Sequence, residues 1–283
     1  MLRKIVHRVM KTASYQIGNF SDINVPGFVL NPAIKIFSFG VGINIDEVAV
    51  PENGFDTFGD FFARQLKSGV RSICKDIDCI ASPCDGRLVA THTLADDNKT
   101  GLIVKGYNYN LKKLLGGSVD DKFAGGRGYV IYLHPRDYHR VHLPVDASLF
   151  EVRHIAGTRF PVAPWSESRV SGLYEKNERM VFNFKVTGGY LSLIMVAAFG
   201  VGNITTPYGP GDGNHITSVR VLKNAVQLTK GDELGAFRLG STVVMLWSKD
   251  LVTDLPDREQ PVLLGQRIGT ILPVNKHARG EKV

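Results

Sequence analysis

Three short blocks of the chain carry side chains that could act together on a carbonyl group. Asp85 lies in CDGRL, His134, His139 and His142 lie in YLHPRDYHRVHLP, and Ser241 lies in RLGSTVV. In a nucleophilic serine site, an aspartate orients an imidazole and the imidazole takes the proton of the serine hydroxyl. The sequence therefore predicts a serine nucleophile at Ser241, with Asp85 and a histidine as its partners.

The histidine block permits other interpretations. Its H-x4-H-x2-H spacing could suggest a metal site, but no carboxylate or thiol at a familiar spacing completes a ligand set, and we predict no metal. In a strand, His139 and His142 would point to opposite faces and have separate roles, unless a bulge realigns them. Asp85 stands between a proline-containing turn and Gly86, so a purely structural turn aspartate is the alternative there.

The surroundings of Ser241 indicate which carbonyl it would attack. The strained G-x-S-x-G turn of the α/β hydrolases is absent, and Gly240 directly precedes the serine. Attack on the unhindered Gly240 carbonyl would convert the peptide bond to an ester. Elimination would leave dehydroalanine, which hydrolyses to a pyruvoyl group and ammonia. The alternative is that RLGSTVV is only a tight turn followed by a strand.

These blocks, in this order, resemble the phosphatidylserine decarboxylase family along nearly the whole chain. LGST resembles the family's self-cleavage motif, DYHRVHLP its histidine block and CDGRL its aspartate block. Cys84 departs from the small residue expected before Asp-Gly, and the glycine-rich loop 205–214 does not match. Further similar segments are 58–73, 104–117, 173–181 and 230–242.

The resemblance implies a specific chemistry. Asp85, His142 and Ser241 match the self-processing triad, and cleavage falls between Gly240 and Ser241. Residue 241 would become a covalent pyruvoyl group, the only cofactor, and would form a Schiff base with the amine of phosphatidylserine. His139 matches the histidine implicated in decarboxylation, which yields phosphatidylethanolamine and CO2 in phospholipid biosynthesis. The alternatives are a decarboxylase of another serine phospholipid, an uncleaved triad serine hydrolase, and a non-enzymatic membrane-binding domain.

The remaining pattern predicts an α+β fold with a β-rich catalytic body. From about residue 80, short apolar or alternating runs are separated by Gly, Pro and Asp, as in a series of strands. The run 193–202 is too short to span a bilayer and predicts a buried strand. A helix is expected over 57–69, capped by Thr57, and a short one over 110–117. We divide the chain into 1–45, 46–240 and the short chain 241–283.

The N-terminal region predicts a membrane partner. Residues 1–13 place apolar and basic side chains on opposite helical faces, and the chain carries a net charge of +7. We expect residues 1–45 to form a membrane-associating helical region. A terminal helix packed on its own domain and a mitochondrial presequence are the alternatives. No zinc-finger or RNP-type motif is present, and we predict no nucleic-acid partner.

Three cysteines bear on the compartment. Their odd number argues against a disulfide framework, so Cys74, Cys79 and Cys84 are expected to be free thiols in a reducing compartment. With the absence of a secretory signal, this predicts a peripheral protein on the cytoplasmic face of a bacterial membrane, with the mitochondrial inner membrane as the alternative. The family resemblance implies a non-covalent long-chain and short-chain heterodimer, which could form a homodimer.

Overall fold

We describe the protein from a computed structural model of the whole chain. Residues 1–20, which hold the predicted amphipathic helix, lie outside the described part of the chain. The structure describes residues 21–95, 102–104, 107–117, 121–162, 170–198, 204–209, 216–238, 241–254 and 256–273.

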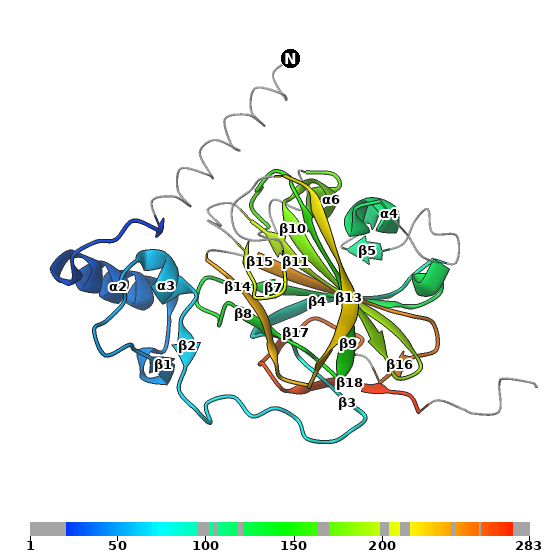
Figure 1. Cartoon of the computed structure of the whole chain (residues 1–283). Coiled ribbons are helices and arrows are strands. Elements are labelled where there is room, and N and C mark those ends of the chain that lie inside the picture. Colours follow the sequence, from blue (N-terminus) through cyan, green and yellow to red (C-terminus); the bar gives the residue numbers. More distant parts are fainter. Residues whose placement is uncertain are drawn as a thin grey trace, which may run out of the picture.

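An eight-stranded antiparallel sheet forms the body of the protein (Figure 1). Among its neighbours only β10 and β11 are joined by a tight turn, and β15, from near the C-terminus, inserts between β11 and β7. The strand order is β13 (Ser218–Leu228), β9 (Ala147–Ile155), β10 (Arg179–Val186), β11 (Gly189–Ala197), β15 (Ser241–Trp247), β7 (Arg127–Leu133), β4 (Gly86–Thr93) and β17 (Gln260–Val262).

The two central strands are buried on both faces. Every residue of β15 is buried, and so are the last seven of β11. Their sequences, STVVMLW and GYLSLIMVA, are continuous apolar runs rather than alternating ones, which is typical of strands covered on both sides. The prediction of a buried strand within 193–202 is confirmed as far as Ala197.

Three smaller sheets pack around this body. The one that matters most for the site joins β14 to β8, where Glu233 pairs with His142. The small sheets are β12 (Ile204–Thr205), β14 (Glu233–Phe237) and β8 (Arg140–His142); β16 (Val252–Thr253), β18 (Arg267–Ile271) and β3 (Cys79–Ala81); and β5 (Leu102–Val104) with β6 (Tyr107–Tyr109). The short helices α4 (Leu111–Leu115), η2 (Asp121–Phe123) and α6 (Leu173–Lys176) lie in the connections.

Residues 21–66 form a helical unit at one side of the body (Figure 1). It has its own apolar cluster, centred on buried side chains of α2 and on Phe61 of α3. Its elements are α2 (Gly27–Val41), η1 (Ile45–Glu47), β1 (Val48–Ala49), α3 (Phe58–Phe62) and β2 (Gln65–Leu66). Among the helices of the described residues, none is long and apolar enough to cross a bilayer.

The helix predicted over 57–69 is shorter than expected. Thr57 does cap it, accepting a hydrogen bond from the Asp60 amide at 3.0 Å. The helix nevertheless ends at Phe62, because Gln65 and Leu66 pair with β1 in a two-stranded ladder. Gly69 lies in a later turn rather than at the helix end. The helix expected within 110–117 is confirmed as α4, with Asn110 as its cap.

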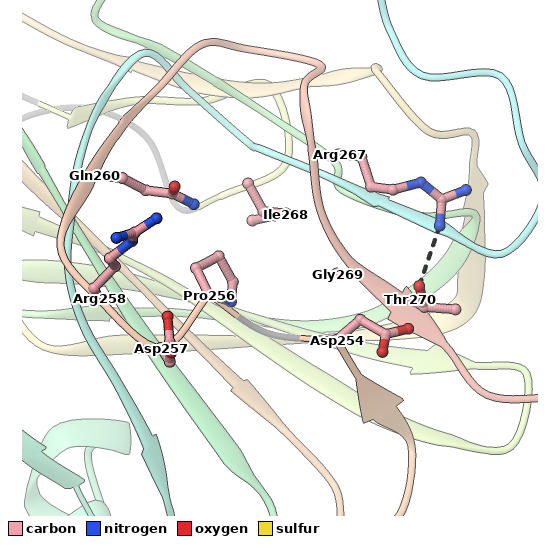
Figure 2. Close-up of a pocket in the computed structure, with 9 residues that line it drawn as sticks. All are labelled: Asp254, Pro256, Asp257, Arg258, Gln260, Arg267, Ile268, Gly269 and Thr270. Atoms are coloured by element: carbon pink, nitrogen blue, oxygen red, sulfur yellow. Dashed lines mark hydrogen bonds between the residues drawn. The ribbon is translucent and has the colours of Figure 1, made fainter.

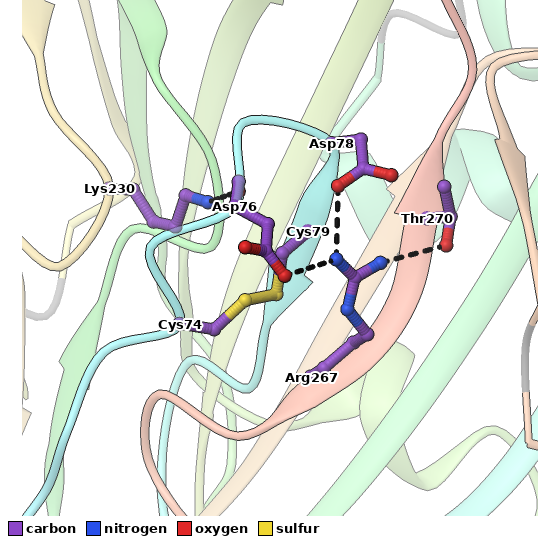
Figure 3. The surroundings of a disulfide bond; sticks show 7 residues. All are labelled: Cys74, Asp76, Asp78, Cys79, Lys230, Arg267 and Thr270. Atoms are coloured by element: carbon purple, nitrogen blue, oxygen red, sulfur yellow. Dashed lines mark hydrogen bonds and ion pairs between the residues drawn. A yellow bond between two sulfur atoms is a disulfide. The ribbon is translucent and has the colours of Figure 1, made fainter.

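The prediction of three free thiols is wrong for two of them. Cys74 and Cys79 form a disulfide, and Cys84 alone is free and buried (Figure 3). Odd cysteine counts exclude complete pairing but not a single bond. Cys74 lies in an irregular segment that turns back at Asp76 to reach β3, so the strand geometry assumed from the spacing does not apply.

The overall fold class is as predicted, α+β with a β-rich body. Two of the predicted features lie wholly or partly outside the described residues, namely the N-terminal helix and residues 210–214 of the loop 205–214. The described part of that loop begins with β12 and continues as an irregular segment to Gly209.

The two phenylalanines near the end of α2 provide a stability test. Phe37 makes edge contacts with the rings of Phe58 and Phe61 at 5.0 and 6.5 Å, whereas Phe39 is 92% exposed. Phe37→Ala should lower the free energy of unfolding by about 2 kcal/mol, less than the ~3–5 kcal/mol of a fully buried ring. Urea unfolding measures this. The control Phe39→Ala should change stability by less than about 0.5 kcal/mol, and an equal loss in both variants would contradict the packing described.

Candidate active site around Ser241

Ser241 is the first residue of β15 and is completely buried. Its register partners are Ala197 of β11 and Leu133 of β7, so it lies in the middle of the large sheet at one end of the strands. Gly240, the other predicted cleavage residue, lies outside the described residues. The strand thus carries the serine at its end, directly after the predicted cleavage point.

His139 is the imidazole that contacts Ser241. Its Nδ1 lies 3.2 Å from the Ser241 hydroxyl, and its Nε2 lies 3.1 Å from the carbonyl oxygen of His134. A carbonyl can only accept, so Nε2 carries the proton and donates it there. Nδ1 then presents its lone pair to the serine hydroxyl. This tautomer is the one that a base for Ser241 requires.

Burial keeps His139 neutral. The side chain is fully buried, and its ring packs on that of Phe62 with 4.2 Å between centroids. Burial, with a smaller contribution from the Arg64 guanidinium, lowers the pKa of His139 to about 3. A neutral imidazole beside a buried hydroxyl can accept its proton but holds no proton of its own on Nδ1.

His142 has the opposite tautomer. Its Nδ1 donates to the Gly231 carbonyl at 2.8 Å, so its Nε2 accepts from the Tyr138 hydroxyl at 3.2 Å. Its pKa is lowered, chiefly by burial. His142 is therefore neutral too, and its accepting nitrogen is already used by Tyr138.

Asp85 lies next to this block. The His142 amide donates to the Pro83 carbonyl at 2.8 Å, which brings the aspartate loop against β8. The carboxylate itself is 4% exposed and is bound by the guanidinium of Arg71 and by the Leu264 amide. Figure 1 shows β3, which leads into this loop, beside β18 near the C-terminus.

The structure thus brings all the predicted blocks together but not with the predicted hydrogen bonds. Ser241 contacts His139, Asp85 contacts Arg71, and His142 contacts Tyr138. The Asp85, His142 and Ser241 triad stays a prediction. Sequence analysis missed Arg71 and Tyr138, although both lie inside segments that resemble the family, because no residue spacing marks an ion pair or a ring hydroxyl as a partner.

Two hollows in the described part of the protein lie outside this cluster of residues. A cleft of about 240 Å³ separates the helical unit from the body, and three arginines line it, namely Arg64, Arg140 and Arg238. Arg64 is buried and its Nε has no hydrogen-bond partner among the described residues. A second pocket, of about 310 Å³, lies between residues 254–260 and β18 (Figure 2). None of the predicted catalytic residues lines either hollow.

Comparison with known proteins identifies the family. The sequence profile described as phosphatidylserine decarboxylase matches residues 58–270. The chain belongs to the phosphatidylserine decarboxylase family. The match includes Asp85, both histidines and Ser241, and it begins at the first residue of α3.

Several bacterial relatives cover most of the chain. The phosphatidylserine decarboxylase proenzyme of Pseudoalteromonas translucida is 35% identical over 86% of this chain and 87% of its own. That of Shewanella halifaxensis is 37% identical over 83% and 85%. That of Marinobacter nauticus is 34% identical over 90% and 91%. The word proenzyme in these names denotes a precursor that must be processed.

The low pKa of His139 predicts an acid-sensitive contribution to stability. The pKa of His139 in the folded protein lies below the ordinary 6.5. The contribution of His139 to the free energy of unfolding is therefore complete above about pH 6.5 and is lost as the pH falls toward about 3. Urea unfolding at several pH values between about pH 7 and about pH 4 gives the slope of the free energy of unfolding against pH. This slope should be smaller in His139→Gln than in the unaltered chain, by up to ~1.4 kcal/mol per pH unit.

His154→Gln is the matched control. The pKa of His154 is raised, chiefly by the hydrogen bond to Glu178. The contribution of His154 to the free energy of unfolding is therefore present at acid pH and is lost as the pH rises. That variant should become relatively less stable at acid pH. If both variants shift the slope in the same direction, the assignment of a neutral His139 is wrong.

Proposed function

We propose that this chain is a proenzyme that cleaves itself between Gly240 and Ser241 and then converts phosphatidylserine to phosphatidylethanolamine and CO2. Family membership supports the reaction. The observation that carries the self-cleavage is the contact between the buried Ser241 hydroxyl and the neutral Nδ1 of His139. An isolated buried serine would not be acidic enough to attack an amide, and an accepting imidazole supplies the missing base.

The proposed cleavage follows from the chain's own groups. The base takes the hydroxyl proton of Ser241, and the oxygen bonds to the carbonyl carbon of Gly240 while the amide nitrogen leaves protonated. The resulting ester eliminates its carboxylate across the α and β carbons of residue 241. Water then adds to the dehydroalanine and ammonia departs, which leaves a pyruvoyl group at the start of the short chain.

The residues around Ser241 fit a pyruvoyl group. The hydroxyl that would generate it lies against an imidazole, and the strand that carries it pairs with a neighbouring strand on each side. When present, this group supplies an electron-withdrawing carbonyl that binds the substrate amine and accepts the electrons released with CO2. His139 contacts residue 241 and is our candidate to return a proton to the α-carbon of the product.

We retain Asp85, His142 and Ser241 as the self-processing triad. The geometry of the uncut chain adds a second candidate, because His139 rather than His142 presents a lone pair to Ser241. For His142 to act, its Nε2 must exchange the Tyr138 hydroxyl for the serine hydroxyl. The two assignments differ in which histidine the cleavage requires.

Ser241→Ala is the direct test of self-cleavage. Without the hydroxyl, the purified protein should remain a single full-length chain without decarboxylase activity. The unaltered protein should give two species under denaturing conditions, residues 1–240 and a short chain that starts at 241 with a blocked terminus. Intact mass spectrometry measures both. A cleaved, active Ser241→Ala protein would contradict the proposal.

Histidine variants and a serine probe separate the alternatives. If the His142→Ala protein is cleaved and the His139→Ala protein is not, the base is His139. The reverse result would assign the base to His142. An uncut unaltered chain that reacts with a fluorophosphonate would instead indicate a serine hydrolase. Assays with vesicles of several serine phospholipids would separate the proposed substrate from related lipids.

We propose that residues 1–45 attach the enzyme to an anionic membrane surface as a peripheral protein. The described part of this region supports the proposal through α2, which has two apolar faces. Leu30 and Ile34 face the apolar cluster of the unit, whereas Phe28, Ile36 and Phe39 are 81%, 74% and 92% exposed on the other side. The net charge of +7 favours an anionic surface.

The cytoplasmic face of a bacterial membrane is the proposed location. The named relatives are bacterial, and the mitochondrial inner membrane is the alternative. The free-thiol argument for a reducing compartment no longer contributes, since Cys74 and Cys79 are bonded.

The arginine-lined cleft beside α3 is our candidate for receiving the anionic headgroup, because guanidinium groups bind phosphate well.

The exposed face of α2 provides the membrane test. Replacing Phe28 and Phe39 by Ser should reduce binding to anionic phospholipid vesicles by about tenfold or more, since each buried ring contributes roughly 1.5–3 kcal/mol. Vesicle co-sedimentation measures this. Ile216→Ser, a similarly exposed apolar residue next to β13, is the control and should bind as the unaltered chain does. Unchanged binding in the double variant would contradict the proposed anchor.

We further propose that the two products stay together as a non-covalent heterodimer, which could assemble into a homodimer. Support comes from β15, which lies between β11 and β7 with seven register pairs to each. Extracting the 241–283 segment would expose an entirely buried strand. The boundaries 1–45, 46–240 and 241–283 then describe an anchor, a catalytic body and the short chain that carries the pyruvoyl group.

A further inference from the structure

Asp85 is a buried carboxylate whose charge is balanced by one guanidinium. Arg71 binds it through Nε and Nη2, at 3.0 Å from Nε to Oδ1 and 2.7 Å from Nη2 to Oδ2. This two-pronged geometry fixes the plane of the carboxylate as well as its charge. At 4% exposure, Asp85 has little access to water that could replace the arginine.

Arg71 comes from a segment without helix or strand, between β2 and β3. Three contacts hold this segment in place. Arg71 Nη2 also lies 3.0 Å from Glu47, the Cys74 amide donates to the Gly265 carbonyl at 2.9 Å, and the disulfide joins Cys74 to β3. A segment of irregular backbone that carries a partly buried cation needs such anchors, because it has no helix or strand hydrogen bonds to hold it.

The loop closed by the disulfide contacts the part of the chain that follows the predicted cleavage point. Arg267 of β18 contacts the carboxylates of Asp76 and Asp78 at 2.8 and 2.9 Å, and Lys230 reaches the Asp76 carbonyl (Figure 3). The Leu264 amide donates to Asp85 at 2.8 Å. Both the disulfide loop and Asp85 therefore contact the 241–283 segment directly.

We propose that Arg71 is a positioning residue for self-cleavage. It acts through Asp85 and makes no contact with Ser241 or the histidines, so it is not itself catalytic. The inference rests on the proposed function, in which Asp85 belongs to the processing site. Arg71 balances the charge of the Asp85 carboxylate and fixes its orientation.

Other charged or titratable groups act on Asp85 and must be considered in any pH test. They come from the helical unit, the irregular segment between β2 and β3, the aspartate loop and the histidine block. They are Glu47, Arg64, Arg71, Cys84, Asp137 and Tyr138. Of these groups, Arg71 is the one that donates hydrogen bonds to the carboxylate, so its removal should dominate the change.

The experiment follows maturation of the full-length chain after cell-free synthesis, by denaturing gel at a series of pH values. Arg71→Ala should slow the appearance of the short chain by about tenfold or more, and Arg71→Lys should restore part of the rate. The pH range of maturation should move upward in Arg71→Ala, because a buried carboxyl without its cation is protonated more readily. A merely structural role would lower the thermal midpoint without moving this profile.

One further variant makes the test specific. Lys67→Ala, an exposed cation on the same segment, is the matched control and should mature normally. If Arg71→Ala does not fold, Arg71→Lys decides, and a normal rate and a normal pH profile in that variant overturn the proposal.

Asp85→Asn separates this inference from the proposed function. If Asp85→Asn matures at the unaltered rate, the role of Asp85 in cleavage is wrong and the inference fails with it. If Asp85→Asn is blocked while Arg71→Ala matures with an unaltered rate and pH profile, only the inference is overturned. Faster maturation of Arg71→Ala would also overturn it, since Arg71 would then restrain the carboxylate rather than aim it.

Discussion

The hydrogen bond between Ser241 and His139 depends on the placement of one strand. β15 inserts between β11 and β7, and every one of its residues is buried. Its first residue is consequently held at the end of the sheet, where the turn after β7 presents His139. The site is built from strands close in space but distant in sequence, and it exists only once the sheet has closed around β15.

Burial of that strand determines the electrostatics of the site. In a solvated cleft, His139 would titrate near neutral pH, but full burial keeps it neutral. The His134 carbonyl then selects the tautomer that leaves Nδ1 free to accept. The same desolvation requires that Asp85 have a cation, which Arg71 supplies. Neutral histidines and a balanced carboxylate are thus two consequences of one dry environment.

The two ends of the chain meet the site differently. The helical unit brings Phe62 onto His139 and places Glu47 against Arg71, so it supports the site as well as exposing an apolar helix face. The C-terminal segment contributes β15 to the centre of the sheet and a backbone amide to Asp85. Cutting the chain before Ser241 would leave these contacts intact, because none of them passes through the Gly240–Ser241 bond.

The sequence by itself determined the family, the β-rich class and the identity of the chemical groups. Asp85, His139, His142 and Ser241 were recognisable because their short blocks are local in the chain. Local signals also predicted the Thr57 cap and α4, since capping needs only neighbouring residues.

Only the tertiary structure decided which of these groups meet. The length of α3 was overestimated because Gln65 and Leu66 pair with a strand nearly twenty residues earlier. The disulfide, the ion pair between Arg71 and Asp85, and the contact of His139 with Ser241 all join residues brought together by chain folding. Residue spacing along the chain carries no record of such pairings, because sheet closure and desolvation, rather than local propensity, select them.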